Sequence, residues 1–280
     1  MKIKHGMILA AGLGKRMQPL TLNKPKPLLE INNISLLERA INLLINCGVV
    51  EISINVHYLP DQIRNFLNEK KFNVQIYISD ETELLLDTGG GVFAGTNNFN
   101  DNPFFVINPD TLWSKAYIEE TKKLEEVYFN NNKPSLLLVE KNLSIDPSFA
   151  GDFNLKDRLV SKDSENKLIF TGLHITKRSY LKSDSKVFSM NKVWSDLIKD
   201  KNLCGLESKQ KFYHLNKLNL LLLTIIKIKM KTYYFWHQHM LPERKVIQNY
   251  INYKIMYHLI LFIQLYQNTC YVEQMKLPAN

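Results

Sequence analysis

Residues 7–17 read MILAAGLGKRM, and residues 24–28 read KPKPL. The apolar start predicts a short buried strand, and the small residues after it predict a turn that leads directly into Lys15 and Arg16. Such a turn presents backbone N–H groups and two cations to one anion. The stretch therefore predicts a phosphate-binding loop at the end of a strand, as expected in an α/β fold.

The spacing of the glycines excludes the two common phosphate-binding motifs. A Walker loop needs four residues between its first Gly and a Gly-Lys-Ser/Thr, and the dinucleotide fingerprint needs a third Gly where Met17 stands. An acidic residue at the distance expected of a nicotinamide dehydrogenase is also missing. Taken alone, Gly12 and Gly14 are also compatible with a plain tight turn, but the cations that follow them favour a phosphate site.

A second glycine cluster lies at residues 86–93, which read LDTGGGVF. We expect the three glycines to precede a helix and to leave a surface without Cβ atoms, on which a flat base or sugar lies against the backbone. The alternative is a flexible loop.

The third motif is an apolar run that ends in a carboxylate, at residues 104–110, which read FFVINPD. Ligands of open α/β sheets bind beyond the carboxyl ends of the strands, and a carboxylate there is a suitable oxygen ligand for Mg²⁺. Asp110 is therefore the predicted metal ligand. The alternative is that Asp110 caps the following helix.

In this order, the three motifs resemble the sugar-1-phosphate nucleotidyltransferase family, over residues 5 to 214. Together with GDF at residues 151–153 and FTG at residues 170–172, the LDTGGGV form is most similar to N-acetylmuramate-1-phosphate uridylyltransferases and mannose-1-phosphate guanylyltransferase-like proteins. The resemblance implies a Mg²⁺-dependent enzyme that joins a nucleoside triphosphate to a sugar 1-phosphate and releases pyrophosphate. UTP is the favoured nucleotide and GTP the second candidate.

The resemblance also implies roles for the residues that match the motifs. Catalysis would involve Arg16, Lys26 and Asp110. The nucleotide would be bound by Ala10, Ala11, Gly12, Gly14, Lys15 and Gly89. The sugar would contact Asp152 and Gly172. The metal ligand would be Asp110, with His214 as a further candidate.

Two positions depart from the family pattern. Pro109 stands where a Gly is more common and removes one backbone donor. Residues 212–217 read FYHLNK, so His214 stands where relatives have a second metal carboxylate. Because Mg²⁺ prefers oxygen ligands, this change predicts weaker metal binding. A structural histidine is the alternative for this residue, and a catalytically impaired homologue that binds nucleotide or sugar phosphate is the alternative for the protein.

The composition changes after residue 214. Residues 215–280 contain no Gly and no Asp, and they carry eight of the Lys and Arg residues against two Glu. We therefore divide the chain into a nucleotidyltransferase domain at 1–214 and an atypical tail at 215–280. A change of reading frame near residue 215 would explain this composition and predicts a disordered or loosely packed tail. Its apolar runs are too short to cross a bilayer.

The remaining pattern predicts one large Rossmann-like α/β domain, with a mostly parallel sheet and helices on both faces. A smaller β-rich part, residues 152–175, is expected on the sugar side. Strands are predicted at 5–10, 51–56, 74–78, 104–107 and 135–139, and helices at 36–46, 60–69 and 117–129.

Most of the net charge of +9 lies in the tail, which could in principle bind a nucleic acid or an anionic membrane surface. No sustained basic stripe organises its Lys and Arg residues, so no nucleic-acid partner is expected. The three cysteines have no paired spacing, which argues against a disulfide framework or a zinc site. The first residues lack the apolar region of a signal peptide, so we expect the protein in the reducing cytoplasm.

Overall fold

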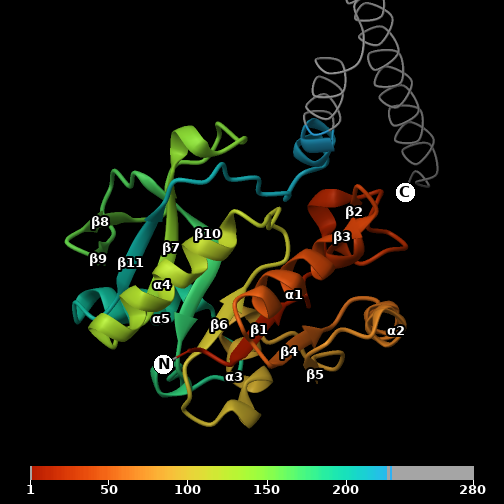
Figure 1. Ribbon diagram of the computed structural model, residues 1–280, viewed down its shortest axis with the longest axis horizontal. Helices are drawn as coiled ribbons and strands as arrows, with labels where there is room; N and C mark the ends of the chain where they lie inside the picture. Colours follow the sequence, from red (N-terminus) through yellow and green to blue (C-terminus); the bar gives the residue numbers. More distant parts are fainter. Residues whose placement is uncertain (1, 226–227, 229–280) are drawn as a thin grey trace, which may run out of the picture. The chain divides into compact units, whose positions relative to one another are not determined.

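Strand β1 (His5–Leu9) lies inside a nine-stranded sheet with the order β5-β4-β1-β6-β10-β7-β11-β9-β8 (Figure 1). The computed structural model describes residues 2–225 and 228, so most of the predicted tail lies outside the described residues. The other strands of the sheet are β4 (Glu51–Val56), β5 (Gln75–Asp80), β6 (Phe104–Ile107), β7 (Ser135–Glu140), β8 (Asn154–Lys156), β9 (Leu159–Ser161), β10 (Leu168–Thr176) and β11 (Cys204–Ser208).

The strands of this sheet run mostly in one direction. β1 is parallel to β4 and β6, and β4 is parallel to β5. β10 is antiparallel to both β6 and β7, which makes β7 parallel to β6, and β11 is parallel to β7. The predicted mostly parallel sheet is therefore confirmed. β10 belongs to this main sheet, although the sequence placed it in a smaller β-rich part.

Helices cover both faces of the sheet, as predicted. α1 (Leu36–Asn46), α2 (Pro60–Lys70) and α4 (Tyr117–Asn131) pack with Ile8, Ile54 and Ile107 in one core. α3 (Asp87–Gly95) and α5 (Met190–Lys199) contribute to a second core, with Met7 and Val106. Successive side chains of a strand point to opposite faces, which is why neighbouring residues of β1 and β6 belong to different cores.

Local sequence explains why the first helix begins where it does. The side chain of Ser35 accepts a hydrogen bond from the N–H of Glu38, which satisfies a donor that the first helical turn leaves free. All four residues of β6 are buried, as expected of a strand covered by helices on both sides. The bounds predicted for α1, β4 and β6 agree with the structure.

The glycine cluster lies inside α3 and not in front of it, so that part of the prediction is wrong. Packing explains the difference. A Cβ at Gly89 would collide with the ring of Phe188, and a Cβ at Gly91 would come within 2.7 Å of Glu81 Oε1. The glycines allow close contact between the helix and its neighbours, which outweighs their low helix propensity.

Residues 2–225 form one compact unit, which extends beyond the boundary predicted at residue 214. Leu215, Leu220 and Leu221 are buried in it, and residues 218–225 are helical. A short ribbon, β2 (Glu30–Ile31) with β3 (Ile34–Ser35), precedes α1. No helix in the described part of the chain has the length and apolar character needed to span a membrane.

Candidate functional site

A cavity of about 520 Å³ opens beyond the carboxyl ends of four neighbouring strands. Its walls include Leu9 at the end of β1, Asn55 near the end of β4, Glu81 after β5 and Asn108 after β6. This is the edge of an open α/β sheet at which ligands bind. Of the residues predicted for the site, the cavity is lined by Ala11, Gly12, Gly14, Lys15, Arg16, Lys26 and Asp110.

The loop after β1 has the open surface that a phosphate site requires. A Cβ built on Gly12 would have no neighbour within 4 Å, so this backbone is exposed to the cavity. Gly14 has φ +64°, a conformation that favours glycine, and its carbonyl accepts a hydrogen bond of 2.8 Å from the hydroxyl of Thr21. The loop then enters a short 3-10 turn that begins with Lys15 and Arg16. Backbone and cations thus lie on one wall.

An ion pair joins the two residues that the sequence placed at the reaction centre. Lys26 Nζ lies 2.7 Å from Asp110 Oδ2, and the two side chains are 14% and 22% exposed. Burial acts to raise the pKa of Asp110, but the charges of Lys26, His214 and Arg16 outweigh it and lower the pKa to about 2. The carboxylate is therefore ionised at neutral pH.

The other carboxylate oxygen of Asp110 has the properties of a metal ligand. Asp110 Oδ1 is buried and has no hydrogen-bond partner among the described residues. A buried, charged oxygen without a partner is costly unless a cation or a donor satisfies it. The residues present therefore fit a Mg²⁺ ion at Asp110. Within the described residues, no three His, Cys, Asp or Glu side chains gather into a metal-binding group, so further ligands would have to come from elsewhere.

His214 lies beside this carboxylate, with its Nδ1 at 3.8 Å from Asp110 Oδ1. Its backbone forms a bridge with Thr111, and its ring stacks on Phe212 and meets the edge of Phe149. Burial lowers the pKa of His214, although Asp110 acts in the opposite direction. The aromatic packing favours a structural contribution, and the role of His214 as a metal ligand stays a prediction.

Two residues predicted to bind nucleotide lie behind the cavity wall. The N–H of Ala10 donates a hydrogen bond of 2.7 Å to Asn55 Oδ1. The N–H of Gly89 donates to the carbonyl of Phe188 at 2.8 Å, and the Phe188 ring covers the face where a Cβ would stand. Neither residue lines the cavity, so any effect on the nucleotide would pass through these contacts.

The residues predicted for the sugar side also lie outside this cavity. Asp152 Oδ2 accepts a hydrogen bond of 2.8 Å from the N–H of Phe170. Gly172 has φ +93°, and its carbonyl accepts from the N–H of Asn108, a residue of the cavity wall. A Cβ at Gly172 would lie 3.0 Å from Asn108 Cβ, so glycine lets β10 approach the wall closely. Their roles toward a sugar stay predictions.

Sequence reasoning missed a buried polar chain that connects the loop with α3. Asn55 and Glu81 are 3% and 2% exposed. Asn55 Nδ2 donates to Glu81 Oε1 at 2.7 Å, and Glu81 Oε2 accepts from the N–H of Leu86 at 3.0 Å. Together with the hydrogen bond from the N–H of Ala10 to Asn55, these two hydrogen bonds order the base of the cavity. The available signal in the sequence was Asn55 itself, a polar residue near the carboxyl end of a predicted strand that reads EISINV.

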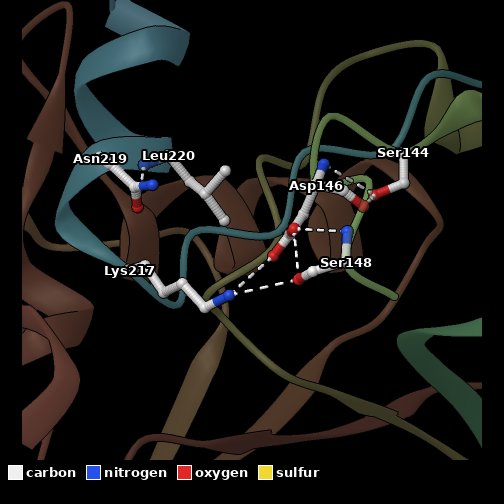
Figure 2. A network of polar contacts seen from close by, with 6 residues as sticks. All are labelled: Ser144, Asp146, Ser148, Lys217, Asn219 and Leu220. Carbon is white, nitrogen blue, oxygen red and sulfur yellow. Dashed lines mark hydrogen bonds and ion pairs between the residues drawn. The ribbon is translucent and has the colours of Figure 1, made fainter. Parts of the chain in front are cut away.

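A second network holds the segment that follows β11, and Figure 2 shows it around Asp146. Asp146 Oδ1 accepts hydrogen bonds from the N–H and the hydroxyl of Ser148, and Oδ2 accepts from Lys217 Nζ at 3.3 Å. Lys217 also donates to the Ser148 hydroxyl. These contacts fix residue 217 against the loop after β7. Asn216, which sequence reasoning also missed, lies next to this anchor and lines the cavity.

Comparison with known proteins agrees with this geometry. The family model described as "Nucleotidyl transferase" matches residues 5–139. N-acetylmuramate alpha-1-phosphate uridylyltransferase of Caulobacter vibrioides is 31% identical over 75% of this chain and 91% of its own length. A mannose-1-phosphate guanyltransferase of Gibberella zeae is 34% identical over 63% of this chain and 50% of its own length, so the chain spans about half of that relative.

Solved structures share the fold. A UDP-glucose pyrophosphorylase complexed with UDP-glucose has a TM-score of 0.68 at 16% identity and covers 82% of this chain and 99% of its own. HddC from Yersinia pseudotuberculosis, complexed with GMP-PN, has a TM-score of 0.65 at 22% identity, over 81% of this chain and 100% of its own. The family model and the relative from Caulobacter vibrioides, which is matched over 91% of its length, agree with the glycine loop and the cavity after β1. The chain therefore belongs to the sugar-1-phosphate nucleotidyltransferase family, which includes relatives named for uridylyl and guanylyl transfer.

Proposed function

We propose that this protein transfers a nucleotidyl group from a nucleoside triphosphate to a sugar 1-phosphate and releases pyrophosphate. UTP is the favoured nucleotide and GTP the second candidate, in line with the names of the relatives. The observation that carries the proposal is the pair of Lys26 and Asp110 in the same cavity as the glycine loop. The pair brings a cation and a free carboxylate oxygen to the point where a triphosphate on the loop would react.

The loop binds and orients the triphosphate in this proposal. The backbone of Gly12 and Gly14 approaches the phosphates, and Lys15 and Arg16 neutralise part of their charge. Lys26 contacts the α-phosphate of the nucleotidyl group that is transferred. Because its ammonium is already held by Asp110, it stabilises the charge that develops in the transition state without reorganising.

The reaction needs no protein nucleophile or base. An oxygen of the sugar phosphate attacks the α-phosphorus in line, the bond to the bridging oxygen breaks, and pyrophosphate leaves. A phosphate monoester is already an anion at neutral pH. Asp110 Oδ1 would hold Mg²⁺, which when bound would neutralise charge on the phosphates. The protein therefore acts by positioning and by charge.

The sugar is proposed to bind on the side of β8, β9 and β10. Gly172 supports this side because its carbonyl fixes Asn108 at the cavity wall. Asp152 holds the N–H of Phe170, two residues before Gly172, and so helps to shape the same strand.

One assay tests the proposal directly. The full-length protein is incubated with Mg²⁺, each of the four nucleoside triphosphates, and a panel of sugar 1-phosphates that includes N-acetylmuramate 1-phosphate and mannose 1-phosphate. We expect pyrophosphate release that depends on both substrates and is greatest with UTP. Nucleotide binding without pyrophosphate release from any pair would contradict the proposal and would indicate a binding homologue.

A further inference from the structure

Two buried acceptor atoms in the cavity wall have no hydrogen-bond partner. One is Asp110 Oδ1 and the other is Asn216 Oδ1. Asn216 is only 7% exposed. Among the cavity-lining residues in the described part of the chain, these are the two with such an atom. Buried amide and carboxylate oxygens are almost always paired, so both atoms point to a ligand with positive charge or a donor.

Backbone hydrogen bonds bring the segments of these two residues together at the cavity wall. The N–H of Leu215 donates a hydrogen bond of 2.8 Å to the carbonyl of Asp110, and the N–H of Leu112 donates to the carbonyl of Tyr213 at 2.9 Å. These bonds pair the segment that carries Asn216 with the segment that carries Asp110, in antiparallel fashion. Asn216 thus lines the cavity from the segment that is paired with the segment of Asp110.

The position of Asn216 is fixed on its other side as well. Lys217 is held by Asp146 and Ser148, as Figure 2 shows. The preceding Leu215 is completely buried. A side chain whose two neighbours are both anchored is preorganised, which is the requirement for a ligand of a small cation.

No donor in the described part of the chain forms a hydrogen bond with Asp110 Oδ1 or with Asn216 Oδ1. Lys26 donates to Asp110 Oδ2, and His214 Nδ1 is 3.8 Å from Oδ1, which is too far for a hydrogen bond. Carboxylate and amide oxygens are both ligands of hard divalent cations. We propose that Asn216 Oδ1 and Asp110 Oδ1 together bind the divalent cation, with Asn216 as the second protein ligand. This inference rests on the cation requirement of the proposed function.

The site would carry little charge. One carboxylate that also faces Lys26, plus a neutral amide, attracts a divalent cation less than two carboxylates do, since affinity rises with the number of charged ligands. Asn216→Asp therefore adds the missing charge in place and should tighten binding, whereas Asn216→Leu removes the oxygen at similar volume.

Binding of Mn²⁺ alone to the full-length protein tests the proposal without any turnover. Free Mn²⁺ is measured by electron paramagnetic resonance for the wild type, Asn216→Leu, Asn216→Asp and Asp110→Asn. We expect weaker binding by about tenfold or more for Asn216→Leu and Asp110→Asn, and tighter binding by about tenfold for Asn216→Asp. Circular dichroism on heating checks that each variant folds.

Asn219 supplies the matched control, because it lies three residues along and is exposed. Asn219→Leu and Asn219→Asp should bind Mn²⁺ as the wild type does. Wild-type affinity in both Asn216 variants, with loss of binding in Asp110→Asn, would overturn the role of Asn216 and leave the proposed metal site at Asp110 intact. Wild-type affinity in Asp110→Asn, or no Mn²⁺ binding by the wild type, would overturn both.

Discussion

The proposed mechanism gives Lys26 a direct contact with the nucleotidyl group that is transferred. Its Nζ is held 2.7 Å from Asp110 Oδ2, and Lys26 begins a short turn between Pro25 and Pro27, which restrict the backbone. Its ammonium is therefore in place before substrate arrives. Electrostatic stabilisation by preorganised groups is usually the largest single contribution to catalysis.

Lys26→Ala should accordingly lower kcat by at least about a hundredfold. The measurement is pyrophosphate release at saturating substrates. Lys24→Ala is the control, because Lys24 is exposed and pairs with Glu30 at the surface. Turnover of Lys26→Ala equal to that of the control would remove Lys26 from the mechanism.

The proposed role of Asp110 as a metal ligand can be tested separately from the role of Lys26. Asp110→Asn keeps the shape of the side chain but replaces the carboxylate by an amide, which binds a hard cation more weakly. We expect most activity to be lost and the Mg²⁺ concentration for half-maximal rate to rise. A Mg²⁺ titration of the residual activity that matches the wild type would place the metal elsewhere.

At the scale of elements, α3 depends on glycine for its packing. A Cβ at Gly91 would lie 2.7 Å from Glu81 Oε1 and 2.8 Å from Asn55 Nδ2, both members of the buried polar chain. Gly91→Ala should therefore destabilise the fold by about 1–3 kcal/mol, despite the better helix propensity of alanine. Urea unfolding measures the change.

Gly12→Ala is the comparison for this prediction. A Cβ at Gly12 meets nothing within 4 Å, but it would project from the cavity wall where the triphosphate is proposed to lie. We expect unchanged stability and a raised KM for the nucleotide. Equal stability of Gly91→Ala and Gly12→Ala would show that α3 tolerates the extra methyl group.

The pH dependence of the whole molecule should carry the signature of His174. This side chain is 2% exposed, and neither ring nitrogen has a hydrogen-bond partner among the described residues. Burial lowers its pKa to about 3. Below its unfolded value of about 6.5, the unfolded chain binds a proton that the folded protein does not, so stability falls as the pH falls from there toward 3.

His174→Leu should remove this contribution, which amounts to at most about 1.4 kcal/mol per pH unit. The free energy of unfolding is measured in urea between pH 7.5 and 4.5 for both proteins. We expect the wild type to lose stability more steeply over this range. Parallel curves would mean that His174 takes up a proton in the folded state.

The parts of the fold that could be predicted are those set by local sequence. The bounds of α1, β4 and β6 follow from the pattern of apolar residues and, for α1, from the Ser35 cap. These signals lie within the elements or next to them in the sequence. The antiparallel direction of β10 could not be predicted, because it depends on which distant strands it pairs with. In the same way, the residue types of Asn55, Glu81 and Asn216 are visible in the sequence, whereas their shared orientation toward one cavity is a property of the assembled sheet.

The position of β10 also affects how the protein is made on the ribosome. The strands β5, β4, β1 and β6 are neighbours in the sheet and are all synthesised by residue 107, so they can pair as soon as they emerge. β7 follows them, but both of its neighbours, β10 and β11, are made later. The part of the sheet formed by β5, β4, β1 and β6 can therefore form early during translation. β7 has to wait with two unpaired edges until the nascent chain has grown beyond residue 176.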